Sequence, residues 1–369
     1  MVVMNKEKRI KDNCVIYLVI FIILLIWFNL IFFSFNYKSN LPHKMCCKLT
    51  GKDAIVDSTK YDVGGTDLGI IIKHNNRYYF LFGDTFSTSN KIGNWRSNTM
   101  AISNDSDPSD GIIIDTWISE PDNFFAKELI SSLKVDNVEI TCIPTTAISL
   151  NGNIYVYYMS VKHWSNIGGV WKCNNSSIAL STDNGQTFSK ISNVSWDGNS
   201  NFILFSAVQP NNDSDEFIYF LSTPSGRFGD CYLSRVAPLE ILNKTAYEYY
   251  SNKTLINDPI WSKNENEAIP IFNSPVGEMS IMWNEYLKKW TVFYTDCELS
   301  SIVLRVADNL YGSWSDPIII VDADEYPSLY GSYVHPDFVK NKGEIVYFIM
   351  SVFFQYNTYV MSVNLNSLF

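Results

Sequence analysis

The sequence lacks the features that mark nucleotide-binding, nucleic-acid-binding and zinc-stabilised proteins. It has no glycine-rich phosphate loop and no Cys-x-x-Cys pair. It has no Lys/Arg cluster that could follow a phosphate track, and its formal net charge is −10, so nucleic acid is not expected as a partner. Only 18 Gly and 13 Pro occur in 369 residues, which argues against disorder. We predict neither a metal nor a cofactor.

Aromatic residues, in contrast, make up 15% of the chain and gather in a recurring β-pattern. A turn precedes an aromatic-rich return strand, and a third strand of similar character follows. The return strands are expected at residues 78–82, 154–158, 217–221, 290–294 and 345–349, and the third strands at 99–103, 177–181, 231–235, 302–306 and 359–363. Five copies of one unit predict an all-β fold, a five-bladed β-propeller.

Weaker signals complete the predicted blades. Residues 112–118 and 318–321 are candidate outer strands, and part of residues 51–62 is expected to close the last blade. The apolar spacing within residues 121–135 predicts an inserted helix. Residues 181–188 match the Asp-box pattern, which is typical of turns between propeller strands.

The N-terminal segment is almost wholly apolar over residues 15–35, long enough to span a bilayer. We predict a cytoplasmic tail (1–13), a single transmembrane signal anchor (14–35), a stalk (36–50) and a lumenal or extracellular propeller (51–369). Six cysteines fall beyond the anchor and allow 15 pairings, of which none is preferred. Asn-x-Ser/Thr sequons there are compatible with glycosylation.

Three ionisable residues occupy the same place in different repeats. Asp67, Glu278 and His335 each stand twelve residues before the central aromatic residue of a return strand. This register places them at the start of innermost strands, around the mouth of the central channel. Two carboxylates at one mouth can serve as acid and base in glycoside hydrolysis.

The loops after the return strands should share this mouth. They supply Asp84 as a further carboxylate and Trp95, Arg96, Trp164 and Arg227 as candidate sugar-binding side chains. Each residue also has a structural alternative. Asp67 and Asp84 could serve turns, Arg227 could pair with Asp230 or another acid, and His335 could be a buried, hydrogen-bonded imidazole.

Several strings resemble the domain of unknown function family 4185. They are Gly-Gly-Thr-Asp-Leu-Gly (64–69), Phe-Gly-Asp-Thr-Phe (82–86), Arg-Ser-Asn (96–98), Pro-Ser-Gly-Arg-Phe-Gly (224–229), Val-Gly-Glu-Met-Ser (276–280), Gly-Ser-Trp-Ser (312–315) and Tyr-Gly-Ser-Tyr-Val-His-Pro (330–336). The family is similar to five-bladed propeller glycosidases, and some members are implied to be endo-D-arabinanases. The resemblance implies Asp67 as base or nucleophile and Glu278 as general acid, with Asp84 in place of a tuning Asp.

Two functions therefore remain open. One is a membrane-anchored glycoside hydrolase that cleaves a glycan, for example an arabinofuranoside, with Asp67, Glu278 and Asp84 as catalytic residues. The other is a non-catalytic carbohydrate-binding propeller, a lectin or surface adhesin. In both, the substrate-binding candidates are His335, Arg227, Arg96, Trp95, Trp164 and Tyr333, and the partners are a glycan and a membrane.

The predicted topology leads to a first test. In sealed microsomes, the propeller should resist added protease until detergent is present, because the anchor would place it on the non-cytosolic side. Digestion of the propeller without detergent would contradict this orientation.

Overall fold

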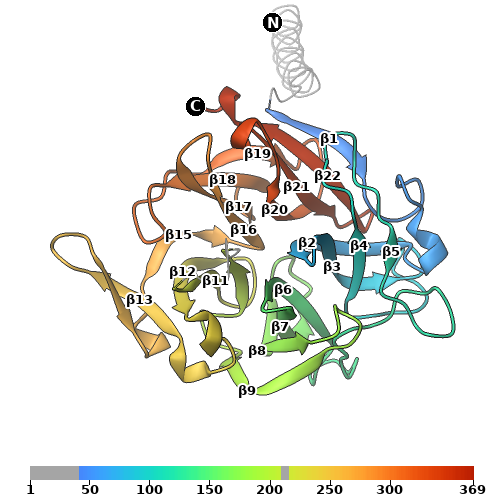
Figure 1. Ribbon diagram of the computed structural model, residues 1–369, viewed down its shortest axis with the longest axis horizontal. Coiled ribbons are helices and arrows are strands. Elements are labelled where there is room, and N and C mark those ends of the chain that lie inside the picture. The colour runs from blue at the N-terminus through green and yellow to red at the C-terminus, as the bar shows by residue number, and fades with distance from the viewer. Residues whose placement is uncertain (1–40, 209–215) are drawn as a thin grey trace, which may run out of the picture. The chain divides into compact units, whose positions relative to one another are not determined.

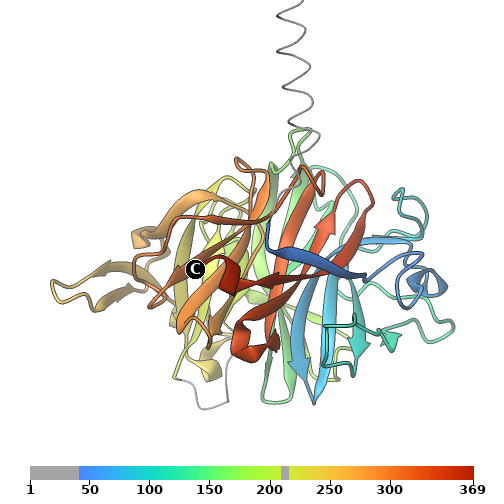
Figure 2. The same cartoon turned by 90° about the horizontal axis from the view of Figure 1, so that it is seen from above.

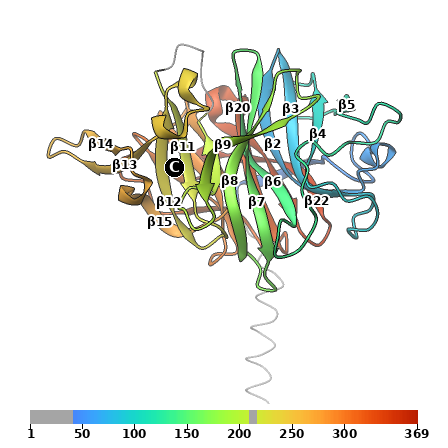
Figure 3. The ribbon, with the colours of Figure 1, turned by 90° about the horizontal axis from the view of Figure 1, so that it is seen from below.

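The protein is an all-β propeller. The computed structural model describes residues 41–208 and 216–369, and the residues from Pro42 to Phe369 form one compact unit. Five antiparallel sheets lie in this part of the chain, and Figure 1 shows them arranged around a common centre. Figures 2 and 3 show the unit from the side, with the strands of neighbouring sheets standing next to one another.

Each sheet begins with an innermost strand and runs outward through hairpins. The first sheet contains β2 (Gly65–His74), β3 (Arg77–Phe86), β4 (Thr99–Ser103) and β5 (Thr116–Trp117). The second contains β6 (Thr141–Leu150), β7 (Asn153–Trp164), β8 (Trp171–Ser181) and β9 (Ser189–Asp197).

The third sheet departs from the four-stranded plan. It contains β10 (Leu204–Ala207), β11 (Ile218–Thr223), β12 (Gly229–Val236), β13 (Glu248–Lys253) and β14 (Pro259–Ser262), with β15 (Pro270–Val276) also paired to β12. The fourth contains β16 (Met279–Asn284), β17 (Lys289–Asp296), β18 (Ser301–Ala307) and β19 (Ile318–Asp322). The fifth contains β20 (Leu329–Lys340), β21 (Ile345–Val352), β22 (Asn357–Asn364) and β1 (His43–Lys48).

The strand that closes the last sheet is β1, and Figure 2 shows it in blue beside the red strands of the C-terminus. The prediction that residues 51–62 would close this sheet was right in principle and wrong in position. Residues 43–48 pair antiparallel with β22, so this part of the predicted stalk belongs to the propeller. Residues 58–61 instead form a short 3-10 helix, η1 (Ser58–Tyr61).

The predicted helix at residues 121–135 is wrong, because this segment is an irregular loop. Several of its backbone amides find partners outside the segment rather than four residues back. Those of Leu129 and Ile130 donate to Oδ1 of Asn98, and that of Ala126 donates to the carbonyl of Tyr61. Tertiary hydrogen bonds thus replace the helical ladder that the apolar spacing indicated.

The Asp-box turn is confirmed between β8 and β9. Asp183 accepts hydrogen bonds from the backbone N–H and the hydroxyl of Thr187 at 2.9 and 2.6 Å. Ser181 donates to Asp183 at 2.7 Å and accepts from the amide of Gly185 at 2.8 Å. These bonds are local, so Asp183 has a structural task.

Other 3-10 helices are short and lie between strands or at the C-terminus. They are η2 (Pro238–Glu240), η3 (Lys244–Ala246), η4 (Glu265–Glu267), η5 (Asn341–Gly343) and η6 (Leu365–Ser367). Within residues 41–208 and 216–369, no helix is long and apolar enough to cross a membrane. The apolar run at residues 15–35, on which the predicted anchor rests, lies outside the described residues.

The apolar core lies between neighbouring sheets. One cluster fills the space between the second and third sheets around Tyr157, Trp196 and Phe220, and another packs the fourth against the fifth around Phe293 and Phe348. The six cysteines of the described residues are free thiols. Burial of aromatic surface between sheets, rather than disulfides, therefore stabilises the propeller.

Closure by β1 predicts a sharp difference between two truncated proteins. A chain that starts at Pro42 keeps every strand of the five sheets, whereas one that starts at Gly51 leaves β22 as an open edge. The longer protein should be monomeric, with a cooperative thermal transition. The shorter one should melt at lower temperature and aggregate. Equal melting temperatures for the two proteins would contradict closure by β1.

Candidate functional site

A cavity of about 680 Å³ opens at one end of the central channel. Its lining comes from the starts of innermost strands and from the loops after the return strands, as the blade pattern predicted. The candidate residues that line it are Asp67, Asp84, Trp95, Trp164, Arg227 and Glu278. The structure thus brings together side chains that lie up to 211 positions apart, from Asp67 to Glu278.

Asp67 is turned toward this cavity by an irregular stretch of β2. Leu68 and Gly69 both have positive φ, at 69° and 99°, and the pairing with β3 shifts register on either side of Leu68. Such backbone is uncommon for a residue with a side chain, and it often marks a functional site. A Cβ at Gly83 on β3 would come within 2.4 Å of Asp67 Oδ1, so glycine there leaves room for the carboxyl group.

Two carboxyl groups in the cavity bind protons unusually well. Burial raises the pKa of Asp67 to about 7, and the negative charge of Asp84 adds to this effect. Burial likewise raises the pKa of Asp84 to about 6, although Thr141 and Trp95 donate hydrogen bonds to it at 2.6 and 2.8 Å. Near neutral pH this pair can both hold and release a proton.

Glu278 has a different environment. The guanidinium group of Arg227 donates to both of its carboxylate oxygens, from Nε at 2.8 and 3.0 Å and from Nη2 at 2.6 Å. Both side chains are largely buried, with 19% of Arg227 and 10% of Glu278 exposed. This two-pronged contact fixes the orientation of the Glu278 carboxylate. The sequence left open which acid pairs with Arg227, and the structure shows that it is Glu278.

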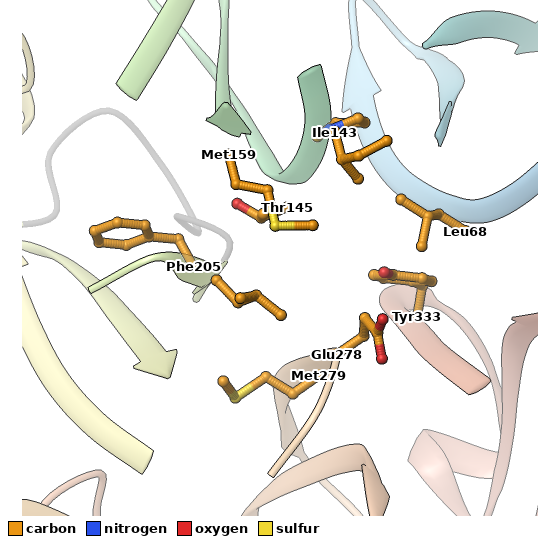
Figure 4. Close-up of a pocket in the computed structure, with 10 residues that line it drawn as sticks. Leu68, Ile143, Thr145, Met159, Phe205, Glu278, Met279 and Tyr333 are labelled. Carbon is orange, nitrogen blue, oxygen red and sulfur yellow. The ribbon is translucent and has the colours of Figure 1, made fainter. Parts of the chain in front are cut away.

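Tyr330 connects the two acidic groups. Its hydroxyl donates to Oδ2 of Asp67 at 2.8 Å, and the guanidinium carbon of Arg227 lies 4.6 Å from the centre of its ring. A narrower cavity shares Leu68 and Glu278 with the large one and is also lined by Tyr333. Figure 4 shows the carboxyl group of Glu278 beside the ring of Tyr333, among apolar side chains.

His335 does not line the large cavity, contrary to the register prediction. From Val334 to Val339 the strand β20 advances by five residues, whereas its partner β21 advances by only two, from Phe348 to Val346. The extra residues in β20 move His335 away from the mouth. Its ring lies 5.6 Å from that of Tyr78, and its Nδ1 accepts from the amide of Asp337. Burial lowers the pKa of His335 to about 4, which is the behaviour of a neutral buried imidazole.

Arg96 likewise points elsewhere. Its Nη1 donates to Oδ2 of Asp62 at 2.8 Å, and its Nη2 donates to the carbonyl of the same residue at 2.5 Å. It thus anchors the segment before β2 instead of lining the cavity. Trp164 does line the cavity, with its ring edge-on to that of Trp171 at 5.3 Å.

Sequence reasoning missed Lys91 and Tyr330. Lys91 lines the cavity with its Nζ 3.3 Å from the ring centre of Phe353 and 4.2 Å from that of Tyr356. No motif surrounds Lys91, which lies in a loop. Tyr330 stands at the mouth where equal offsets had placed His335, so a register that allowed for extra residues in β20 would have found it.

In the described residues, no three His, Cys, Asp or Glu side chains are grouped so that they could hold a metal ion.

Together, the five sheets define a β-propeller with an acidic cavity at one end of its channel. The chain resembles the exo-beta-1,3-galactanase of Phanerochaete chrysosporium with a TM-score of 0.55 and 11% identity, over 88% of this chain and 65% of that one. At this identity the likeness concerns the fold alone.

The chain belongs to the family described as Domain of unknown function (DUF4185), whose model matches residues 54–362. Among curated proteins it is similar to "Notoamide biosynthesis cluster protein J" of Aspergillus sp. (strain MF297-2), at 27% identity over 82% of this chain and 83% of that protein. It is also 26% identical to "Notoamide biosynthesis cluster protein J'" of Aspergillus versicolor, over 78% and 81% of the two chains.

The raised pKa of Asp67 predicts a specific pH dependence of stability. In the folded protein Asp67 keeps its proton up to about pH 7, whereas the ordinary pKa of an aspartate side chain is 3.8. Between these values the folded state binds more protons, so stability falls as the pH rises. Replacing Asp67→Asn removes this loss, and the Tm of the variant should gain on the wild type between about pH 4 and about pH 7.

The exposed Asp258 provides the control, since Asp258→Asn should follow the wild type across the range. A constant Tm difference between wild type and Asp67→Asn would show that Asp67 is already ionised at low pH in the folded protein.

Proposed function

We propose that this protein is a glycoside hydrolase whose reaction takes place in the large cavity. The observation that carries the proposal is the convergence of three carboxyl groups, Asp67, Asp84 and Glu278, on one concave site beside aromatic rings. A pair of carboxyl groups with separated proton affinities is what acid–base cleavage of a glycosidic bond needs.

Within this proposal, Asp67 is the proton donor and Asp84 the base or nucleophile. Asp67 has the higher pKa, about 7, and so still holds its proton when Asp84, at about 6, has begun to lose its own. The bonds from Thr141 and Trp95 favour the ionised form of Asp84. This assignment differs from the one that the resemblance implied, in which Glu278 was the acid.

The reason for the difference is Arg227. Its guanidinium group donates to both carboxylate oxygens of Glu278, so both oxygens already accept hydrogen bonds in this arrangement, and Glu278 is not the proton donor in the proposal. In the proposal, Glu278 binds the substrate. Its carboxylate oxygens, fixed in place by Arg227, can also accept hydrogen bonds from the hydroxyl groups of the sugar.

The substrate class of this proposal is a glycan or glycoside, with arabinofuranosides as the first to test, since some members of the family are implied to act on arabinan. The apolar run at residues 15–35 supports a membrane-anchored form with the propeller in the lumen or outside the cell.

A second candidate is a carbohydrate-binding propeller without turnover. The Arg227–Glu278 pair favours it, because a carboxylate fixed by an arginine still accepts hydrogen bonds from sugar hydroxyls. The two candidates differ in the effect of Asp67→Asn: a hydrolase loses turnover, whereas a lectin has no turnover to lose and keeps its sugar binding.

The test is a hydrolysis panel of arabinofuranosides, galactosides, xylosides and glucosides with the protein from Pro42 to Phe369. Asp67→Asn and Asp84→Asn should each lower kcat by at least about a hundredfold, the usual scale of acid–base catalysis. The wild-type kcat/KM should be bell-shaped. It should fall below about pH 6 as Asp84 gains its proton and above about pH 7 as Asp67 loses its own.

Asp258→Asn serves as the matched control and should keep full activity. Absence of turnover on the whole panel, together with sugar binding that survives Asp67→Asn, would favour the lectin instead. Full activity of Asp67→Asn would contradict the assignment of the proton donor.

A further inference from the structure

One side of the large cavity is apolar and open to solvent. Ile167 and Val170 in the loop between β7 and β8, and Phe228 in the loop between β11 and β12, line it together, and we call these three residues the apolar wall. Their side chains are 66%, 37% and 53% exposed, respectively. Exposed apolar surface that is continuous with a polar site commonly marks a place that a ligand covers.

The apolar wall is held in place by backbone hydrogen bonds. The amide of Arg227 donates to the carbonyl of Gly169 at 2.8 Å, which joins the two loops. The amide of Val170 donates to the carbonyl of Ile167 at 3.2 Å. A Cβ at Gly169 would come within 3.1 Å of the ring of Phe228, so the ring lies directly against this loop. The wall is therefore preformed rather than assembled by the ligand.

The chemistry of the apolar wall differs from that of a subsite for a second sugar. Sugars bind through hydroxyl groups and stack on flat aromatic faces, whereas Ile167 and Val170 offer neither a hydrogen bond nor a flat face. The hydroxyl of Ser165 nearby is engaged within its own loop, where it accepts from the amide of Ile167 at 3.1 Å.

The position of the wall relative to the carboxyl groups is fixed through one pair of neighbours in the chain. Arg227 reaches inward to Glu278, and Phe228, the next residue, lines the wall. The cavity of about 680 Å³ that contains both is of the size that holds drug-sized ligands, roughly 300 to 1,000 Å³.

We propose that the apolar wall binds the apolar aglycone of a small glycoside, an aromatic or alkyl group attached to the sugar that the carboxyl groups process. The substrate class is then a hydrophobic glycoside rather than a long polysaccharide. This rests on the proposed function for the sugar half of the ligand, whereas the wall itself is tested without any sugar.

The test uses N-phenyl-1-naphthylamine, an uncharged probe whose fluorescence rises in apolar sites, with the protein from Pro42 to Phe369. This unit contains every strand of the five sheets. The wild type should bind the probe saturably. Phe228→Ser and Ile167→Ser should each raise its Kd by about tenfold, the scale expected for one lost apolar side-chain contact.

The matched control is Phe124→Ser, which removes a phenylalanine that is 80% exposed and lies outside the cavity lining. Its Kd for the probe should stay within about twofold of the wild type, and thermal melts should show that all variants are folded. Equal probe affinity of Phe228→Ser and Phe124→Ser would overturn the proposal. So would a Phe228→Ser variant that changes sedimentation but not probe affinity, since the wall would then join two copies of the chain.

A second arm separates failure of this inference from failure of the hydrolase. For whichever sugar the panel shows to be cleaved, Phe228→Ser should lower kcat/KM for the 4-nitrophenyl glycoside by about tenfold and leave that for the corresponding disaccharide within about twofold. If substitutions in the apolar wall weaken probe binding but no glycoside is cleaved, the result would support the apolar site and contradict the hydrolase. Equal losses for both substrates would overturn the aglycone assignment.

Discussion

The buried pair between Arg227 and Glu278 is the contact on which the rest of the site depends. A guanidinium group in this position requires a compensating charge, and Glu278 from another sheet provides it. From Arg227 the contacts reach every sheet. Its amide donates to the carbonyl of Gly169 in the loop between β7 and β8 of the second sheet. Its guanidinium group lies over Tyr330 in the fifth sheet, and Tyr330 donates to Asp67 in the first.

This network divides the acidic groups into two kinds. Glu278 is paired with Arg227, whereas the hydrogen bonds to Asp67 and Asp84 come from the uncharged side chains of Tyr330, Trp95 and Thr141. Burial raises the pKa of both aspartates. Burial of the Asp67 and Asp84 carboxyl groups and the positive φ of Leu68 both lower the stability of the fold. A strand with a purely structural role would not need either feature. Sites that sacrifice stability in this way usually do so for function.

The sequence predicted the propeller well because each repeat contains its own local signals. Turn residues between alternating aromatic strands, as at Asn75 and Asn76 before β3, determine hairpins without help from the rest of the chain. The closing strand lies earlier in the chain than predicted, and residues 121–135 form a loop instead of the predicted helix. Both features depend on partners that are distant in the sequence. The pairing of β1 with β22 and the bonds from Asn98 are formed only in the assembled ring.

The sequence by itself determined the repeat, the register that places Asp67 and Glu278 at one mouth, and the acidic character of the site. The tertiary structure buries Asp67 and Asp84, which raises the pKa of each, and it places Arg227 on Glu278. It also excluded His335, since extra residues in β20 change its register, and it assembled the apolar wall from loops of two sheets. The sequence gives the identity of each acidic residue, but its pKa depends on burial and on neighbouring groups, which come together only when the chain folds.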